Sequence, residues 1–255
     1  MVVHLAKKTL AIFDTFKTKR SEFTGEALRQ RAIITCLAQA EVSSDKTRTS
    51  ISQYIAKENN VVWKNIYSGI FRDLDEILIP LGIVEEEGRL PLRRGPKVLQ
   101  ENGMPYYHLT RKGLLVALSI SESGDRESIM NEFFANDFYD TEEVPVQEII
   151  LKLQKTAPKF TFSLFEKYTK AYCDGKMQDL LPFSIANLKM ASDKESDIEM
   201  ELLEGDETMV CFPCRQSHEE IIGLMMFRAQ NVRAAMKEEE MEAGRGVLSA
   251  PSQQE

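Results

Sequence analysis

The chain has 255 residues, of which 43% are hydrophobic and 28% are charged, a balance that supplies a buried core and excludes a disordered chain. No stretch approaches the ~18 uninterrupted apolar residues of a membrane-spanning helix. Charges at Lys7, Lys8 and Asp14 interrupt the N-terminus before a secretory apolar run develops. Four cysteines are too few for a disulfide framework. We therefore expect an intracellular, cytoplasmic protein with no membrane partner.

The net charge of -8 is unevenly distributed along the chain. Residues 1–112 carry 18 Lys and Arg against 13 Asp and Glu, a net charge of +5, whereas residues 113–255 carry 14 against 27, a net charge of -13. Such asymmetry is typical of a protein in which one part approaches a polyanion and the other does not.

Three helices are predicted in the first third of the chain. Apolar residues recur at three- and four-residue intervals in segments 26–40, 51–58 and 62–79. Thr49 or Ser50 is the expected N-cap of the second helix, because a hydroxyl oxygen there accepts from free N–H groups of the first turn. The apolar stripe of the first helix comprises Leu28, Ile33, Ile34, Leu37 and Ala38, with Arg29 and Arg31 outside it.

A hairpin-like extension and a fourth helix follow. Pro80 and Gly82 end the third helix, and strand-like runs at 81–84 and 106–109 flank a loop rich in Arg, Pro and Gly. This loop is expected to project into solvent because its cations are costly to bury. Thr110 is the expected N-cap of an apolar helix ending near residue 120.

The remainder of the chain is predicted to be mostly helical. The long final helix, 219–242, has a broad apolar surface with a Met-Met pair, which fits a core helix and a homodimer interface equally well. The predicted helices span 125–138, 146–154, 160–174, 177–190 and 219–242, with short strands at 198–203 and 208–212.

From about Glu26 to Ser119 the chain resembles the winged helix-turn-helix superfamily of DNA-binding domains. The segments that carry the resemblance are ISQYIAKENNVVWKNIYSGIFRDLDEILIPLGIVEEE and YYHLTRKGLLVAL, the second with Leu-Thr-x-x-Gly at 109–113. The resemblance implies that the third helix enters the major groove by its N-terminal half while the wing contacts neighbouring backbone or the minor groove. The expected fold is mainly α: an N-terminal helical extension (1–21), a winged-helix domain of three helices plus β-wing (22–120), an acidic, mostly helical domain (121–243) and a disordered tail (244–255).

Cations and hydrogen-bond donors cluster where this fold would meet DNA. The candidates on the third helix lie off its apolar stripe and can donate to phosphates or base edges. The cations of the wing would bind phosphates and gain affinity by counterion release. The candidates near the start of the second helix lie beside its free N–H groups, which favour an anion. The alternative for each cation is that it is an ordinary solvated side chain. The acidic run Glu85–Glu87 also interrupts the basic surface that DNA binding would favour. Trp63 and Phe71 are expected to pack rather than to stack on bases. The candidate DNA-binding residues are Lys46, Thr49, Ser50, Lys64, Asn65, Ser68, Arg72, Arg89, Arg93, Arg94 and Lys97.

The C-terminal half contains one group of soft metal ligands, Cys211 and Cys214 with His218. Three ligands are one short of the usual structural zinc site, so ordinary cysteines are favoured and no metal or cofactor is expected. Catalytic motifs are missing from the sequence, which favours a protein that is not an enzyme. The sequence thus predicts sequence-specific double-stranded DNA binding by a transcriptional regulator, and the final helix leaves a homodimer as one of its two readings. The alternatives are a protein-interaction scaffold that uses the winged helix as a docking module, and a metal or redox sensor.

Overall fold

A computed structural model describes residues 9–13, 25–92, 101–120, 125–135 and 144–191. The protein is mainly helical, with one small two-stranded antiparallel sheet. Within the described ranges, no helix combines the length and the apolar character needed to cross a membrane. The helices and strands are α1 (Gly25–Gln39), η1 (Ser43–Lys46), α2 (Arg48–Glu58), α3 (Trp63–Arg72), η2 (Asp73–Leu78), β1 (Val84–Leu90), β2 (Met104–Leu109), α5 (Arg111–Ser119), α6 (Arg126–Ala135), α7 (Val144–Thr156), α8 (Pro158–Cys173) and α9 (Ile185–Ala191).

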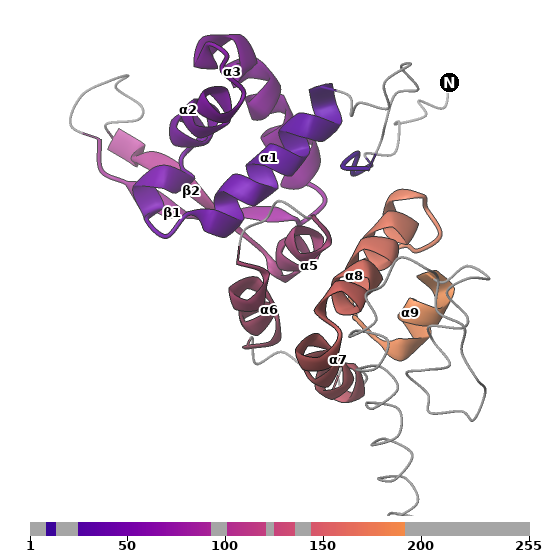
Figure 1. The fold of residues 1–255 in the computed structure, drawn as a ribbon. Coiled ribbons are helices and arrows are strands. Elements are labelled where there is room, and N and C mark those ends of the chain that lie inside the picture. The colour runs from indigo at the N-terminus through magenta and orange to yellow at the C-terminus, as the bar shows by residue number, and fades with distance from the viewer. Residues whose placement is uncertain (1–8, 14–24, 93–100, 121–124, 136–143, 192–255) are drawn as a thin grey trace, which may run out of the picture.

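Helix α5 connects two groups of elements. Figure 1 shows α1, α2, α3 and the hairpin at one end of the molecule and α7, α8 and α9 at the other. Residues 113–119 of α5 are all buried, because α1 packs on it from one group and α6 and α8 from the other. In the second group the ring of Phe183 lies 5.4 Å from that of Phe165 and 4.9 Å from that of Tyr168, forming an aromatic core.

Thr47 caps α2, so the prediction that Thr49 or Ser50 would do so is wrong. Thr47 has extended backbone angles (φ -82°, ψ 156°), and its hydroxyl oxygen accepts from the Ser50 N–H at 3.2 Å. Thr49 and Ser50 lie inside the first turn. Asn59 and Asn60 end the helix, Asn60 with a positive φ of 51°.

Helix α3 continues into the π-helical segment η2, so the predicted helix 62–79 is one continuous helical segment. Its buried side carries Ile70, Leu74 and Leu78. Pro80 follows the segment, and Gly82 takes a φ of +66°, in the left-handed region that glycine tolerates. The apolar side of this helical segment therefore packs in the core, and the opposite side of α3 faces solvent.

The first helix departs from its predicted stripe at two positions. Leu28 is 48% exposed, whereas Gln30 is fully buried. The side-chain oxygen of Gln30 accepts from the N–H of Ala11 at 2.9 Å, and Leu10 and Ile12 are buried with it. The segment 9–13, which belongs to the expected helical extension, forms a turn against α1.

Strands β1 and β2 form an antiparallel hairpin in the register Val84 to Leu109 and Leu90 to Met104, with a bulge near Gly88. The first strand was expected at 81–84, but it begins at Val84 and includes the acidic run 85–87. Thr110 caps α5 as predicted, accepting from the Gly113 N–H at 3.2 Å. A Cβ at Gly113 would lie 2.1 Å from the carbonyl oxygen of Ile83, so only glycine fits there.

In the C-terminal half, α6, α7 and α8 lie where helices were predicted, with boundaries that differ by a few residues. Helix α9 is shorter than the predicted 177–190, because Pro182 interrupts the segment and the helix starts at Ile185. The predicted strands 198–203 and 208–212, the long helix 219–242 with its possible dimer interface, and the tail 244–255 lie outside the described residues.

Candidate nucleic-acid interface

The outward face of α3 carries four of the predicted DNA-binding residues: Lys64, Asn65, Ser68 and Arg72 are all exposed. They lie on one face because the opposite side of the helix packs on α1 and α2. No ion pair of Lys64 occurs among the described residues, and its amine lies 6.0 Å from the centre of the Trp63 ring. Helix α3 therefore presents hydrogen-bond donors and cations to solvent.

A buried ion pair fixes α3 against α1. Arg29 Nε donates to Asp73 Oδ2 at 2.7 Å, and its Nη2 donates to Oδ1 at 3.3 Å. Asp73 is fully buried. A Cβ at Gly69 would lie 2.8 Å from Arg29 Nε, so glycine leaves room for the guanidinium. Sequence reasoning missed this pair, since its partners are 44 residues apart.

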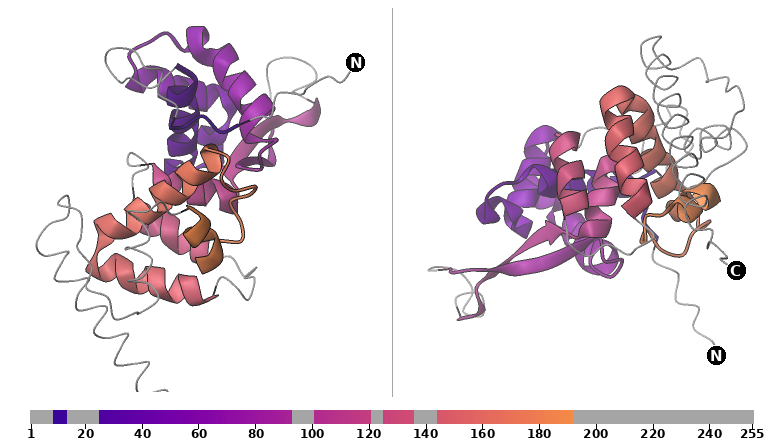
Figure 2. Two further views of the ribbon diagram at one scale, coloured as in Figure 1. Left: turned by 90° about the vertical axis from the view of Figure 1, so that its right-hand side faces the viewer. Right: turned by 90° about the horizontal axis from the view of Figure 1, so that it is seen from below.

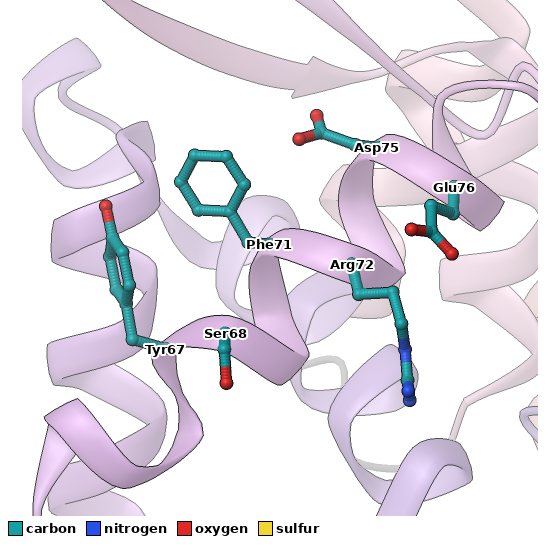
Figure 3. Close-up of a pocket in the computed structure, with 6 residues that line it drawn as sticks. All are labelled: Tyr67, Ser68, Phe71, Arg72, Asp75 and Glu76. Atoms are coloured by element: carbon teal, nitrogen blue, oxygen red, sulfur yellow. The ribbon is translucent and has the colours of Figure 1, made fainter.

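A shallow groove runs along the outward side of α3 (Figure 3). Tyr67, Phe71 and Asp75 line one edge at four-residue spacing, and Ser68, Arg72 and Glu76 line the other. Its volume is about 470 Å³. Phe71 was expected in the core, but it is only half-buried and borders this groove.

Arg48 connects α2, α3 and the hairpin. Its guanidinium forms an ion pair with Asp75 and lies 3.9 Å from the centre of the Phe71 ring and 5.2 Å from that of Tyr107 in β2. Burial raises the pKa of Tyr107, and the charge of Arg48 opposes that shift. These contacts of Arg48 could not be predicted from the sequence, because its partners come from separate elements.

The region around the acidic run of β1, called the hairpin base below, contains cations that are already paired, one in β1 and one in the adjoining η1. Arg89 Nε lies 2.7 Å from Glu86 Oε1, and Lys46 Nζ lies 3.8 Å from Glu87 Oε2. His108 Nε2 lies 3.0 Å from Glu85 Oε1. The acidic run thus neutralises the charges of Arg89 and Lys46. The other predicted wing cations, Arg93, Arg94 and Lys97, lie outside the described residues.

Thr49 and Ser50 differ in how much of each side chain remains available. The Ser50 hydroxyl donates to the Ser44 carbonyl at 2.7 Å, and its N–H donates to Thr47. Ser50 therefore has partners within the chain for both donors. Thr49 is half-buried on the outer side of the first turn.

The charge of this half of the molecule is close to balanced without residues 93–100. Residues 25–92 and 101–120 carry 10 Lys and Arg against 11 Asp and Glu. Residues 93–100 add three cations and no carboxylate. Attraction of a polyanion to this half therefore depends on the exposed cations of α3 and on the three cations in the sequence of residues 93–100.

The candidate metal ligands Cys211, Cys214 and His218 lie outside the described residues. Within the part of the chain that the structure describes, no three His, Cys, Asp or Glu residues are placed to hold a metal ion. Burial, and to a lesser degree Asp45, raises the pKa of the Cys36 thiol to about 12. Cys36 is therefore protonated at neutral pH and is a poor nucleophile or metal ligand.

No protein-family model matches this chain, and no curated protein or solved structure matches it either.

Proposed function

We propose that the chain binds double-stranded DNA through a winged helix-turn-helix unit and acts as a sequence-specific transcriptional regulator, not as an enzyme. The observation that carries the proposal is the outward face of α3, where Lys64, Asn65, Ser68 and Arg72 are exposed together. In this reading α2 and α3 form the helix-turn-helix, α3 is the recognition helix, and β1 and β2 form the wing.

The position of α3 supports this assignment. Among the described residues, α7, α8 and α9 lie at the opposite end of the molecule from α3 (Figure 1), so they leave its outward face uncovered. A helix needs an open face to enter the major groove, which is about 12 Å wide. Lys64 and Arg72 supply charge for phosphates or guanine, and Asn65 and Ser68 supply hydrogen bonds to base edges.

The hairpin supports the proposal by its shape. Figure 2 shows β1 and β2 projecting as a long arm away from the helical body. Arg48 ties this arm to α3, because it lies between Phe71 of the helix and Tyr107 of the strand. Arg48 thus fixes the position of the hairpin relative to α3. A fixed relative position is needed if both elements are to contact the same duplex.

Fluorescence anisotropy with a labelled duplex tests the proposal. The full chain is titrated into duplex DNA at salt concentrations between about 50 and about 200 mM, where each phosphate contact contributes a slope of about -0.9 to log K against log salt. We expect binding at low salt that weakens steeply as salt rises, and competition by unlabelled duplex of a preferred sequence. Absence of binding at low salt would overturn the proposal.

A second candidate function is a protein-docking module. The observation in its favour is the hairpin base, where Arg89 and Lys46 are paired with glutamates and the surface is not strongly positive. A docking module would bind a protein partner and would show little binding to duplex DNA. The same anisotropy experiment therefore separates the two functions.

A further inference from the structure

The outward side of α3 carries an aromatic row as well as a polar one. Trp63, Tyr67 and Phe71 follow one another at four-residue spacing, with ring centroids 5.6 Å and 5.4 Å apart. All three rings are half-buried, so part of each stays open to solvent. Directly before the row, Val61 and Val62 are 45% and 60% exposed. Apolar surface is thus continuous from the turn before α3 to its last turn.

The aromatic row and the polar row face the same space. Figure 3 shows Tyr67 and Phe71 on one edge of the groove and Ser68 and Arg72 on the other. Lys64 continues the polar row one turn earlier. A partner that fits both rows needs hydrogen-bond acceptors and negative charge beside small apolar groups.

The major groove offers this combination wherever thymine occurs. Thymine presents a 5-methyl group beside its O4 acceptor, and phosphates line the groove. Apolar side chains that contact this methyl distinguish thymine from the other bases. We propose that the aromatic row of α3 contacts thymine methyl groups, so that the protein prefers duplexes with thymines at the bases opposite Tyr67 and Phe71. This inference rests on the proposed DNA binding and adds the kind of base that is read.

The carboxylates of the groove are compatible with this contact. Asp75 is paired with Arg48, which reduces its repulsion of phosphate. Glu76 lies at the far end of the groove, more than two turns from Val62. The charged end and the apolar start of the helix are therefore separated along its axis.

Replacing thymine by uracil tests the inference, because uracil lacks the 5-methyl group and keeps O4 and the base pairing. The full chain selects its preferred duplex from a random-sequence pool, and that duplex is then synthesised with thymine or with uracil throughout. We expect the uracil duplex to bind about fourfold more weakly for each methyl group contacted. Equal affinity for the two duplexes would overturn the inference while leaving DNA binding intact. Absence of salt-dependent binding to either duplex would overturn the proposed function itself.

Variants of Tyr67 separate a methyl contact from a change in duplex shape. Tyr67→Gln removes one ring of the row and should lower the thymine-to-uracil affinity ratio by about fourfold, while the part of the ratio due to Phe71 remains. Tyr67→Phe keeps the apolar ring and should retain the preference for thymine. Tyr54→Gln is the matched control, since Tyr54 is an exposed tyrosine of α2 outside the row, and it should also retain the preference. A thymine-to-uracil affinity ratio that is the same in Tyr67→Gln as in the unmodified chain would overturn the inference.

Discussion

Helix α3 and the base of the hairpin both carry cations, but they hold them differently. Lys64 is exposed and makes no ion pair among the described residues, and Arg72 is 55% exposed, with Nη2 3.8 Å from Asp73. Arg89 and Lys46 instead face Glu86 and Glu87. A paired cation must give up its carboxylate before it meets a phosphate, whereas an unpaired one releases counterions at once. The number of cations in a segment is therefore a poor guide to how much that segment contributes to DNA affinity. We expect α3 to contribute more to this affinity than the hairpin base does.

The largest expected effect comes from removing the support of α3. Arg29→Ala leaves the fully buried Asp73 without its main partner, and loss of one partner of a buried pair costs about 3 kcal/mol or more. Unfolding in denaturant measures this loss. Lys57→Ala, at an exposed position of α2, is the control and should change stability by less than about 0.5 kcal/mol. A change below about 1 kcal/mol for Arg29→Ala would show that the pair does not hold the helix.

Neutralising the unpaired cation of α3 should weaken DNA binding more than any single change in the hairpin base. Lys64→Gln removes one phosphate contact, so the salt slope should fall by about 1 and the affinity at low salt by roughly tenfold. Anisotropy at several salt concentrations measures both quantities. An unchanged slope would place Lys64 outside the interface.

Removing the carboxylates of the hairpin base should strengthen binding. Glu86→Gln with Glu87→Gln frees Arg89 and Lys46, which now pair with them. We expect affinity to rise about threefold to tenfold and the salt slope to steepen by one or two. If the slope stays the same, the hairpin base does not approach phosphate.

Arg89→Gln alone should have the smallest effect. Its guanidinium already pairs with Glu86, and exposed pairs of this kind contribute less than about 1 kcal/mol. We expect less than a twofold loss of affinity in the unmodified background, but a larger loss when Glu86 is also Gln. A large loss from the single change would mean that Arg89 leaves Glu86 for DNA at little cost.

The features that could be predicted from the sequence are local. Helical spacing fixed the outward face of α3, because residues such as Lys64, Ser68 and Arg72 fall off its apolar stripe. The Thr110 cap was equally evident, since one hydroxyl residue stands directly before an apolar helix. Both need only a few neighbouring residues.

The features that were missed depend on partners distant in sequence or on a choice between similar neighbours. Asp73 looks like a surface carboxylate until Arg29 of α1 is brought beside it. Gln30 is buried because a backbone N–H of segment 9–13 reaches it. The cap of α2 was misplaced because Thr47, Thr49 and Ser50 satisfy the same local rule, and backbone geometry selects Thr47.

Dimethyl sulfate footprinting tests the placement of α3 most directly. The reagent methylates guanine N7 in the major groove and adenine N3 in the minor groove. Protection of one or the other atom therefore distinguishes a protein bound in the major groove from one bound in the minor groove. With the full chain bound to a duplex that it prefers, the account predicts protection of guanine N7, which disappears in the Lys64→Gln, Arg72→Gln double variant. Unprotected guanine N7 on a saturated duplex, or protection of adenine N3 alone, would contradict entry of α3 into the major groove.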